Sequence, residues 1–133
     1  MEEIKKIPQR SEVAVEDTWA TEDMFVSDEA WEEELKVLAE EGKALGAYAG
    51  RLAESGKTLY EYLSKMEAVD DRGGLLANYC MRKADQDTRE ATYQAMVGKF
   101  MSVVVGLSAA TSFETPEIMA ISDEDMDRFY AEK

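Results

Sequence analysis

The feature of this sequence that most constrains its fold is an apolar seam in residues 31–52. Apolar residues recur there with alternating steps of four and three positions: Trp31, Leu35, Leu38, Gly42, Leu45, Ala49 and Leu52. Residues at this spacing lie on one face of an α-helix, so we predict a helix of about seven turns, beginning after Ser27 and ending near Gly56. The small residues Gly42 and Ala49 indicate that a partner helix, the fourth along the chain, crosses closely there.

Shorter apolar stripes with helical spacing predict four further helices, over residues 58–69, 75–86, 89–113 and from Ser122 onward. A capping box starting at Thr58 opens the second helix, a break is expected at residues 70–74, and Pro116 is expected to stop the fourth helix. The sequence therefore predicts an all-α fold, an up-and-down bundle of four main helices plus a C-terminal helix.

The N-terminal residues 1–26 differ from the rest of the chain. They lack a sustained helical period and contain Pro8, which predicts an extended arm. Large apolar side chains in this arm are candidate anchors onto another surface: Val13, Val15, Trp19, Met24 and Phe25. We therefore expect an arm over residues 1–26 and a helical bundle domain over residues 27–133.

Charge limits the partners that this chain can bind. The 133 residues include 29 acidic and 15 basic side chains, which gives a formal net charge of −14. Nucleic acid and anionic membranes repel such a surface. The most apolar run, Met101–Ala110, is too short to cross a bilayer. We therefore expect no nucleic acid and no membrane as a partner.

Cysteine usage indicates the cellular compartment. Cys80 is the only cysteine, so it cannot form an intramolecular disulfide, and it lies in an apolar segment that favours a buried thiol. Lys5 and Lys6 are not followed by the apolar segment of a signal peptide. A cytoplasmic location is expected.

Residue types that carry most enzyme chemistry are missing or scattered. The chain has no histidine, the commonest zinc ligand and general base, and one cysteine cannot hold a metal. The acidic residues 32–34 and 40–41 fall on the side away from the seam, which predicts a solvated surface. Gly73 and Gly74 are not followed by the lysine of a phosphate-binding loop. We therefore predict no catalytic, cofactor-binding or metal-binding residue.

Three segments, in one register, resemble a known family. The first contains Arg10, Glu12, Trp19, Asp23, Met24, Phe25 and Trp31. The second, ADQDTREATYQAM, spans residues 84–96, and the third, LSAATSFETPEIMAIS, contains Phe113, Pro116, Glu117 and Ile118. Together they resemble the start of the oligoendopeptidase F peptidases. Ala20, Thr21 and the Gly73-Gly74 pair depart from that pattern.

The resemblance implies that this chain is the N-terminal, non-catalytic domain of a cytoplasmic zinc metalloendopeptidase that hydrolyses short peptides. In that family a His-Glu-x-x-His helix and a downstream glutamate hold the zinc. The motif is absent here, so no catalytic residue transfers and the chain alone is expected to be inactive. It is expected to pack on the catalytic remainder of the peptidase and to form part of the wall or lid of the substrate cleft.

A function of another class stays open. The alternative is a stand-alone acidic helical adaptor that binds a protein or peptide without enzymatic activity. The helical pattern reaches Lys133 without a cap or glycine stop, which favours a piece of a longer peptidase. Because the arm and the fourth helix supply more apolar surface than a small bundle needs, a homodimer of the isolated chain is also expected.

Overall fold

A computed structural model describes residues 6–132. Its α-helices are α1 (Asp28–Leu45), α2 (Gly56–Gln86), α3 (Ala91–Ala110), α4 (Glu114–Met119) and α5 (Asp123–Ala131). Short 3-10 helices are η1 (Arg10–Glu12), η2 (Val15–Asp17), η3 (Thr21–Asp23) and η4 (Gly46–Tyr48). No strand occurs in this part of the chain. The predicted all-α fold, with four helices and a C-terminal helix, is confirmed.

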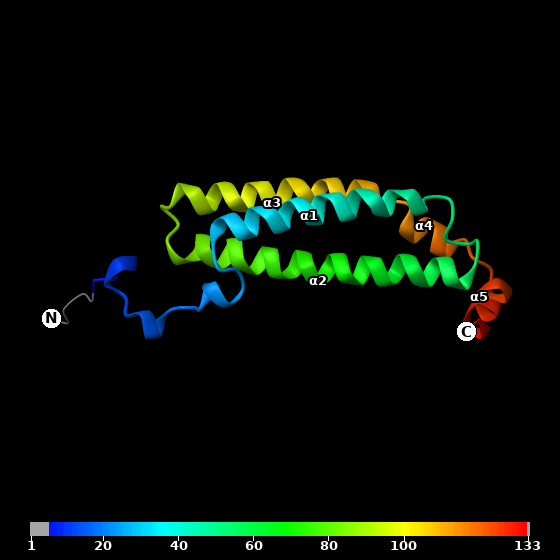
Figure 1. Cartoon of the computed structure of the whole chain (residues 1–133), viewed down its shortest axis with the longest axis horizontal. Coiled ribbons are helices and arrows are strands. Elements are labelled where there is room, and N and C mark those ends of the chain that lie inside the picture. The colour runs from blue at the N-terminus through cyan, green and yellow to red at the C-terminus, as the bar shows by residue number, and fades with distance from the viewer. Residues whose placement is uncertain (1–5, 133) are drawn as a thin grey trace.

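The three long helices, α1, α2 and α3, run side by side in an up-and-down arrangement (Figure 1). Each contributes apolar side chains to a shared core, which includes Trp31, Leu38, Leu76, Cys80, Met96 and Phe100. Trp31 is fully buried, and its indole N–H donates a 2.9 Å hydrogen bond to the carbonyl oxygen of Leu76. This bond satisfies the polar group of a residue that otherwise contributes only apolar contact.

The predicted break at residues 70–74 is wrong, because α2 continues through it as one helix of 31 residues. Val69 and Leu76, seven positions apart, are both buried against the bundle, so the apolar face runs past the glycines without interruption. Arg72, between them, pairs with Glu34 and Glu41 of α1. Tertiary packing therefore overrides the weak helix propensity of the two glycines.

The start of α2 also differs from the expected capping box at Thr58. Ser55 is the N-cap, and its hydroxyl oxygen accepts a 3.0 Å hydrogen bond from the backbone N–H of Thr58. Gly56, which was expected to end the first helix, instead begins α2. The helix end at Gln86 agrees with the predicted one.

The first helix is shorter than predicted. Its seam is buried from Trp31 to Leu45, but α1 ends at Leu45 and the chain turns through η4 and then through Gly50, whose φ is +79°. Ala49 is consequently exposed, and Tyr48 takes the buried position instead. Leu52 lies beyond the turn and is still fully buried.

The predicted close crossing at Gly42 is confirmed, whereas the one at Ala49 is wrong. A Cβ atom added at Gly42 would lie 2.8 Å from the Leu107 Cδ1 atom of α3. The helix predicted fourth along the sequence is therefore the one that crosses α1 here.

The C-terminal part of the chain follows the prediction with one exception. α3 falls within the predicted range of 89–113, and Ser122 caps α5 by accepting a 3.1 Å hydrogen bond from the Asp125 N–H. Pro116 does not stop α3, which has already ended at Ala110; it lies in the first turn of α4, where a missing N–H costs nothing.

The N-terminal arm extends away from the bundle and joins it near η3 (Figure 1). Met24 and Phe25 pack against the core, and the Phe25 ring meets Tyr79 edge to face at 5.3 Å. Further out, Trp19 is 54% exposed and Val15 is 85% exposed. The boundary proposed at residue 26 remains a prediction, and residues 1–5 lie outside the described part.

Candidate functional site

The single thiol occupies a structural position. Cys80 lies fully buried in α2, and its Sγ atom is 3.5 Å from the carbonyl oxygen of Ala77. Burial raises the pKa of the thiol to about 11, because the charged thiolate would lose its hydration. A thiol of this kind is almost entirely protonated at neutral pH and does not serve as a nucleophile.

Two buried tyrosines are also structural. The Tyr79 hydroxyl donates a 2.6 Å hydrogen bond to Asp28 of α1, and the Tyr62 hydroxyl donates one of the same length to Glu114 of α4. Burial first, and then the neighbouring carboxylate, raise the pKa of each phenol well above its usual range. These hydroxyls fasten α2 to α1 and to α4, and neither is poised to exchange a proton at neutral pH.

The acidic residues of α1 do more than form a solvated surface. Glu32 pairs with Lys99 of α3 at 2.5 Å, and Glu34 and Glu41 both pair with Arg72 of α2. Glu33 pairs locally with Lys36. Glu32, Glu34 and Glu41, which were expected on a solvated surface, are partly exposed and also reach cations on neighbouring helices. Within residues 6–132, no three His, Cys, Asp or Glu side chains are grouped so as to hold a metal ion.

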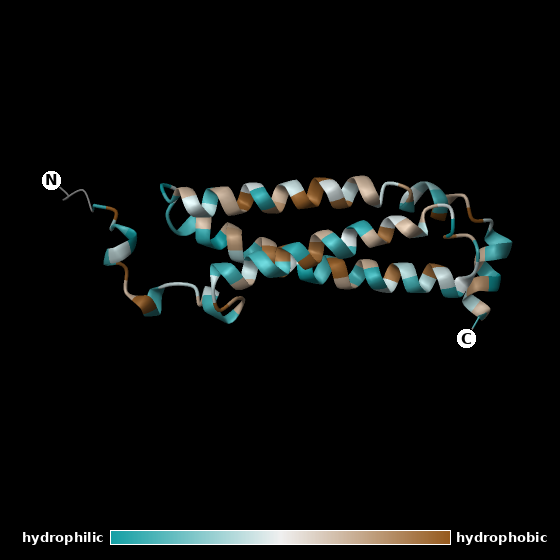
Figure 2. Ribbon diagram, turned by 45° about the horizontal axis from the view of Figure 1, so that its top comes forward, coloured by the Kyte–Doolittle hydropathy of each residue, from teal (hydrophilic) through white to brown (hydrophobic). Residues whose placement is uncertain are grey.

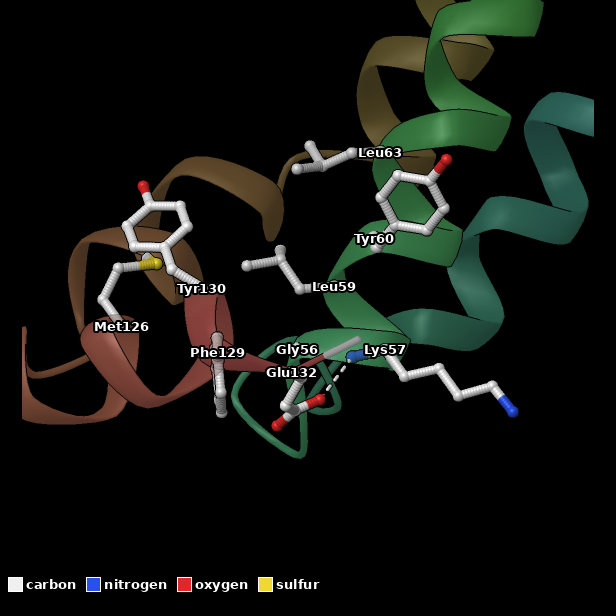
Figure 3. A pocket seen from close by; sticks show the side chains of 9 residues that line it. All are labelled: Gly56, Lys57, Leu59, Tyr60, Leu63, Met126, Phe129, Tyr130 and Glu132. Atoms are coloured by element: carbon white, nitrogen blue, oxygen red, sulfur yellow. Dashed lines mark hydrogen bonds between the residues drawn. The ribbon is translucent and has the colours of Figure 1, made fainter.

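An apolar pocket lies between the start of α2 and α5, with a volume of about 470 Å³ (Figure 3). Its walls are Leu59, Tyr60 and Leu63 from α2, and Met126, Phe129 and Tyr130 from α5. Glu132 closes one end, where a carboxylate oxygen accepts a 3.0 Å hydrogen bond from the Lys57 N–H at the helix start. Because Glu132 already occupies this N-terminus, what remains open is an apolar surface.

A second apolar surface runs along α3. Figure 2 shows this helix in white and brown along most of its length, whereas α1 and α2 carry more hydrophilic teal. Only Met96 and Phe100 of α3 are buried, while Met101 is 46% exposed and Val105 is 66% exposed. The continuous stretch Ala91–Met119 is long and apolar enough to cross a membrane by length and composition alone. The run Met101–Ala110, expected to be too short for this, is part of that longer stretch.

Sequence patterns gave only part of these surfaces. The apolar face of α3 was anticipated from its composition, but the pocket was not, because it depends on α5 folding back over the start of α2. Two pairs of adjacent large apolar residues could have signalled it: Leu59-Tyr60 extends the stripe of α2 outward, and Phe129-Tyr130 does the same for α5.

Taken together, the geometry defines an acidic, all-helical domain with exposed apolar surfaces, in whose described residues no group of His, Cys, Asp and Glu side chains could hold a metal ion. Comparisons with known proteins place it further. It is 40% identical over 128 residues to "Oligopeptidase PepF" of Bacillus subtilis, covering 96% of this chain and 19% of that protein. It is 30% identical over 124 residues to "Oligoendopeptidase F homolog" of Lactococcus lactis subsp. lactis, covering 92% of this chain and 21% of that protein.

A third relative, "Group B oligopeptidase PepB" of Streptococcus agalactiae, is 28% identical over 123 residues, covering 92% of this chain and 20% of that protein. The chain therefore matches the N-terminal region of the oligoendopeptidase F family and spans about a fifth of the length of the curated relatives it matches. No family model and no solved structure matches it.

Proposed function

We propose that this chain is the N-terminal, non-catalytic domain of an oligoendopeptidase F-like zinc metalloendopeptidase that hydrolyses short peptides in the cytoplasm. The observation that carries the proposal is the 40% identity over 96% of the chain to an oligopeptidase about five times as long. A match of this extent covers nearly the whole chain, so it does not depend on one motif.

The zinc of such an enzyme belongs to the remainder of the polypeptide. This chain has no histidine, and its described residues include no group of side chains that fits the metal. The contribution of the chain is therefore structural: a bundle tied by Tyr79–Asp28, Tyr62–Glu114 and Glu32–Lys99 pairs resists deformation and forms a firm boundary to a substrate cleft. A cleft bounded in this way admits short peptides and excludes whole proteins, whether folded or unfolded.

The test is a chimera in which this chain replaces the matching region of the Bacillus subtilis relative. Cleavage of a quenched fluorescent peptide of about eight residues is measured, and an unfolded protein serves as a second substrate. We expect the chimera to cleave the short peptide and to leave the protein largely intact. The matched control is the relative truncated to remove the matching region. Its activity is measured alone and after this chain is added as a separate polypeptide.

The outcomes separate the proposal from its alternative. If the chimera folds and has no selectivity for short peptides over unfolded protein, the role as a cleft wall is wrong. If the truncated relative also fails to bind this chain in sedimentation, a stand-alone adaptor becomes the better interpretation.

A further inference from the structure

The outer face of α3 is apolar and has no partner in the described chain. Met101 and Val105 are exposed by 46% and 66%, and small residues beside them leave the backbone accessible. Lys99 is the only charged residue of α3, and Glu32 of α1 neutralises it at 2.5 Å. An uncharged, exposed helix face of five turns is uncommon on a protein with a net charge of −14.

Two glycines on this face have no explanation within the bundle. Gly98 and Gly106 lie in the interior of α3, where glycine weakens a helix relative to alanine, yet a Cβ atom at either would meet nothing within 4 Å. Gly42 is different, because Leu107 fills the space where its Cβ would be. Ser102 lies midway between the two glycines, so small residues recur every four positions on one side of α3. Such a row lets another backbone approach closely.

We infer that the outer face of α3 docks a helix from the part of the polypeptide that the longer relatives carry beyond the matched region. The inference rests on the proposed function. The relatives indicate where such a helix would come from, since about four fifths of their length lies outside the region that this chain matches. The docking helix presents large apolar side chains over Gly98, Ser102 and Gly106, and it carries basic residues along its flanks to match the acidic bundle.

Charge argues against two other possible partners for this face, a second copy of the chain and an anionic bilayer. The homodimer expected from the surplus of apolar surface would bring another net charge of −14 against the first, and this repulsion opposes it. An anionic bilayer is repelled for the same reason, and insertion of α3 would detach Met96, Phe100 and Leu107 from the core. A segment of the same polypeptide avoids both costs.

The first experiment measures how well residue 102 is covered. Ser102→Cys is placed in the chimera described above and in the isolated chain, and its alkylation is followed by mass spectrometry of the peptide that contains it. Cys80 is fully buried and gives little background. We expect alkylation of the Ser102→Cys thiol to be at least tenfold slower in the chimera than in the isolated chain. Gly74→Cys, at an exposed helical position of α2 with nothing within 4 Å, is the control and should react at similar rates in both.

The second experiment uses a pair of substitutions that should change the melting temperature in opposite directions in the isolated chain and in the chimera. Gly98→Leu combined with Gly106→Leu should raise the melting temperature of the isolated chain, because leucine favours the helix and meets open space. The same pair should lower the melting temperature of the chimera by several degrees, because the side chains obstruct the docked helix. Gly74→Leu should raise the melting temperature of both.

Each outcome has a distinct meaning. If the chimera cleaves short peptides selectively and the thiol at 102 reacts as fast in it as in the isolated chain, the docking inference is overturned and the proposed function stands. If the wild-type chimera is folded but unselective, the proposed function itself fails. Protection of the thiol at 102 in a dimer of the isolated chain, or binding of that chain to vesicles of phosphatidylglycerol, would overturn the inference in favour of the corresponding occupant.

Discussion

A glycine at position 42 sets how closely α1 and α3 approach. The Leu107 side chain occupies the space that a larger residue would need, with its Cδ1 atom 2.8 Å from where a Cβ would lie. Gly42→Leu should therefore overpack the crossing and lower the free energy of unfolding by about 1–3 kcal/mol, measured by urea denaturation.

Two exposed alanines serve as controls for this prediction. Ala47→Leu and Ala49→Leu should change the free energy of unfolding by less than about 0.5 kcal/mol, since neither side chain is buried. Equal losses at positions 42, 47 and 49 would show that the glycine has no special role.

The contrast between Gly42 and Ala49 shows what residue spacing can predict. Spacing identified the buried face correctly from Trp31 to Leu45, because the backbone there is an α-helix. It failed at Ala49, because four-and-three spacing has meaning only while the helix continues. Gly46 and Gly50 are the local signal that the helix ends before Ala49, because the chain turns through η4 and through Gly50 with its positive φ.

At the scale of single elements, two glycines in open space allow a matched test of where helices end. Gly74 lies inside α2, and Gly50 lies in the turn after η4 with φ +79°; a Cβ at either meets nothing within 4 Å. Gly74→Ala should stabilise the chain by about 0.5–1 kcal/mol through helix propensity. Gly50→Ala should destabilise it by about 1 kcal/mol through the left-handed backbone.

Chemical denaturation of both variants measures the difference. If residues 70–74 formed the loop predicted from sequence, Gly74→Ala would bring no gain in stability. The sequence could not settle this point, because the continuity of α2 depends on Leu38, Glu34 and Glu41 of another helix.

The hydrogen bonds from Tyr62 to Glu114 and from Tyr79 to Asp28 predict how the stability of the fold depends on pH. Tyr62 and Tyr79 have pKa values raised above 10 in the folded chain, first by burial and then by Glu114 and Asp28. Folding therefore favours the protonated phenols, and their contribution is full below about pH 10 and is lost as the pH rises through the folded-state pKa values. Stability should fall steeply above pH 10.

Tyr62→Phe combined with Tyr79→Phe isolates this contribution. At pH 7 the variant should be less stable by about 1–3 kcal/mol for each lost hydrogen bond to a carboxylate. Between pH 9 and pH 11 the gap to the wild-type chain should narrow, as measured by urea denaturation across the range. A gap that stays constant would mean that these phenols do not couple folding to alkaline pH.

At the scale of the whole molecule, the missing ligands predict that the isolated chain folds independently of zinc. It has no histidine, and its only cysteine is fully buried. An excess of a chelator such as EDTA should leave its melting temperature unchanged, measured by circular dichroism. A fall of several degrees, or one zinc per chain in elemental analysis of the purified protein, would contradict this prediction.

The fold class and family could be predicted from sequence because both depend on features spread over the whole chain, such as apolar spacing and segments in one register. The binding surfaces depend on how distant segments meet. The pocket at α5 forms only where Phe129 and Met126 face Leu59, a contact between positions about 70 residues apart. The exposure of Gly98 and Gly106 likewise follows from which side of α3 turns toward α1 and α2.

The unbroken length of α2 connects the two ends of the molecule through one continuous helix. At 1.5 Å per residue, its 31 residues form a strut of about 46 Å. Tyr79, near one end, holds the arm through Phe25, and Leu59, at the other end, packs beside α5. With no joint between them, a tilt of about five degrees about the arm would carry the α5 pocket through about 4 Å. A small rotation at one end of α2 would therefore produce, at the other end, a displacement comparable to the width of a side chain.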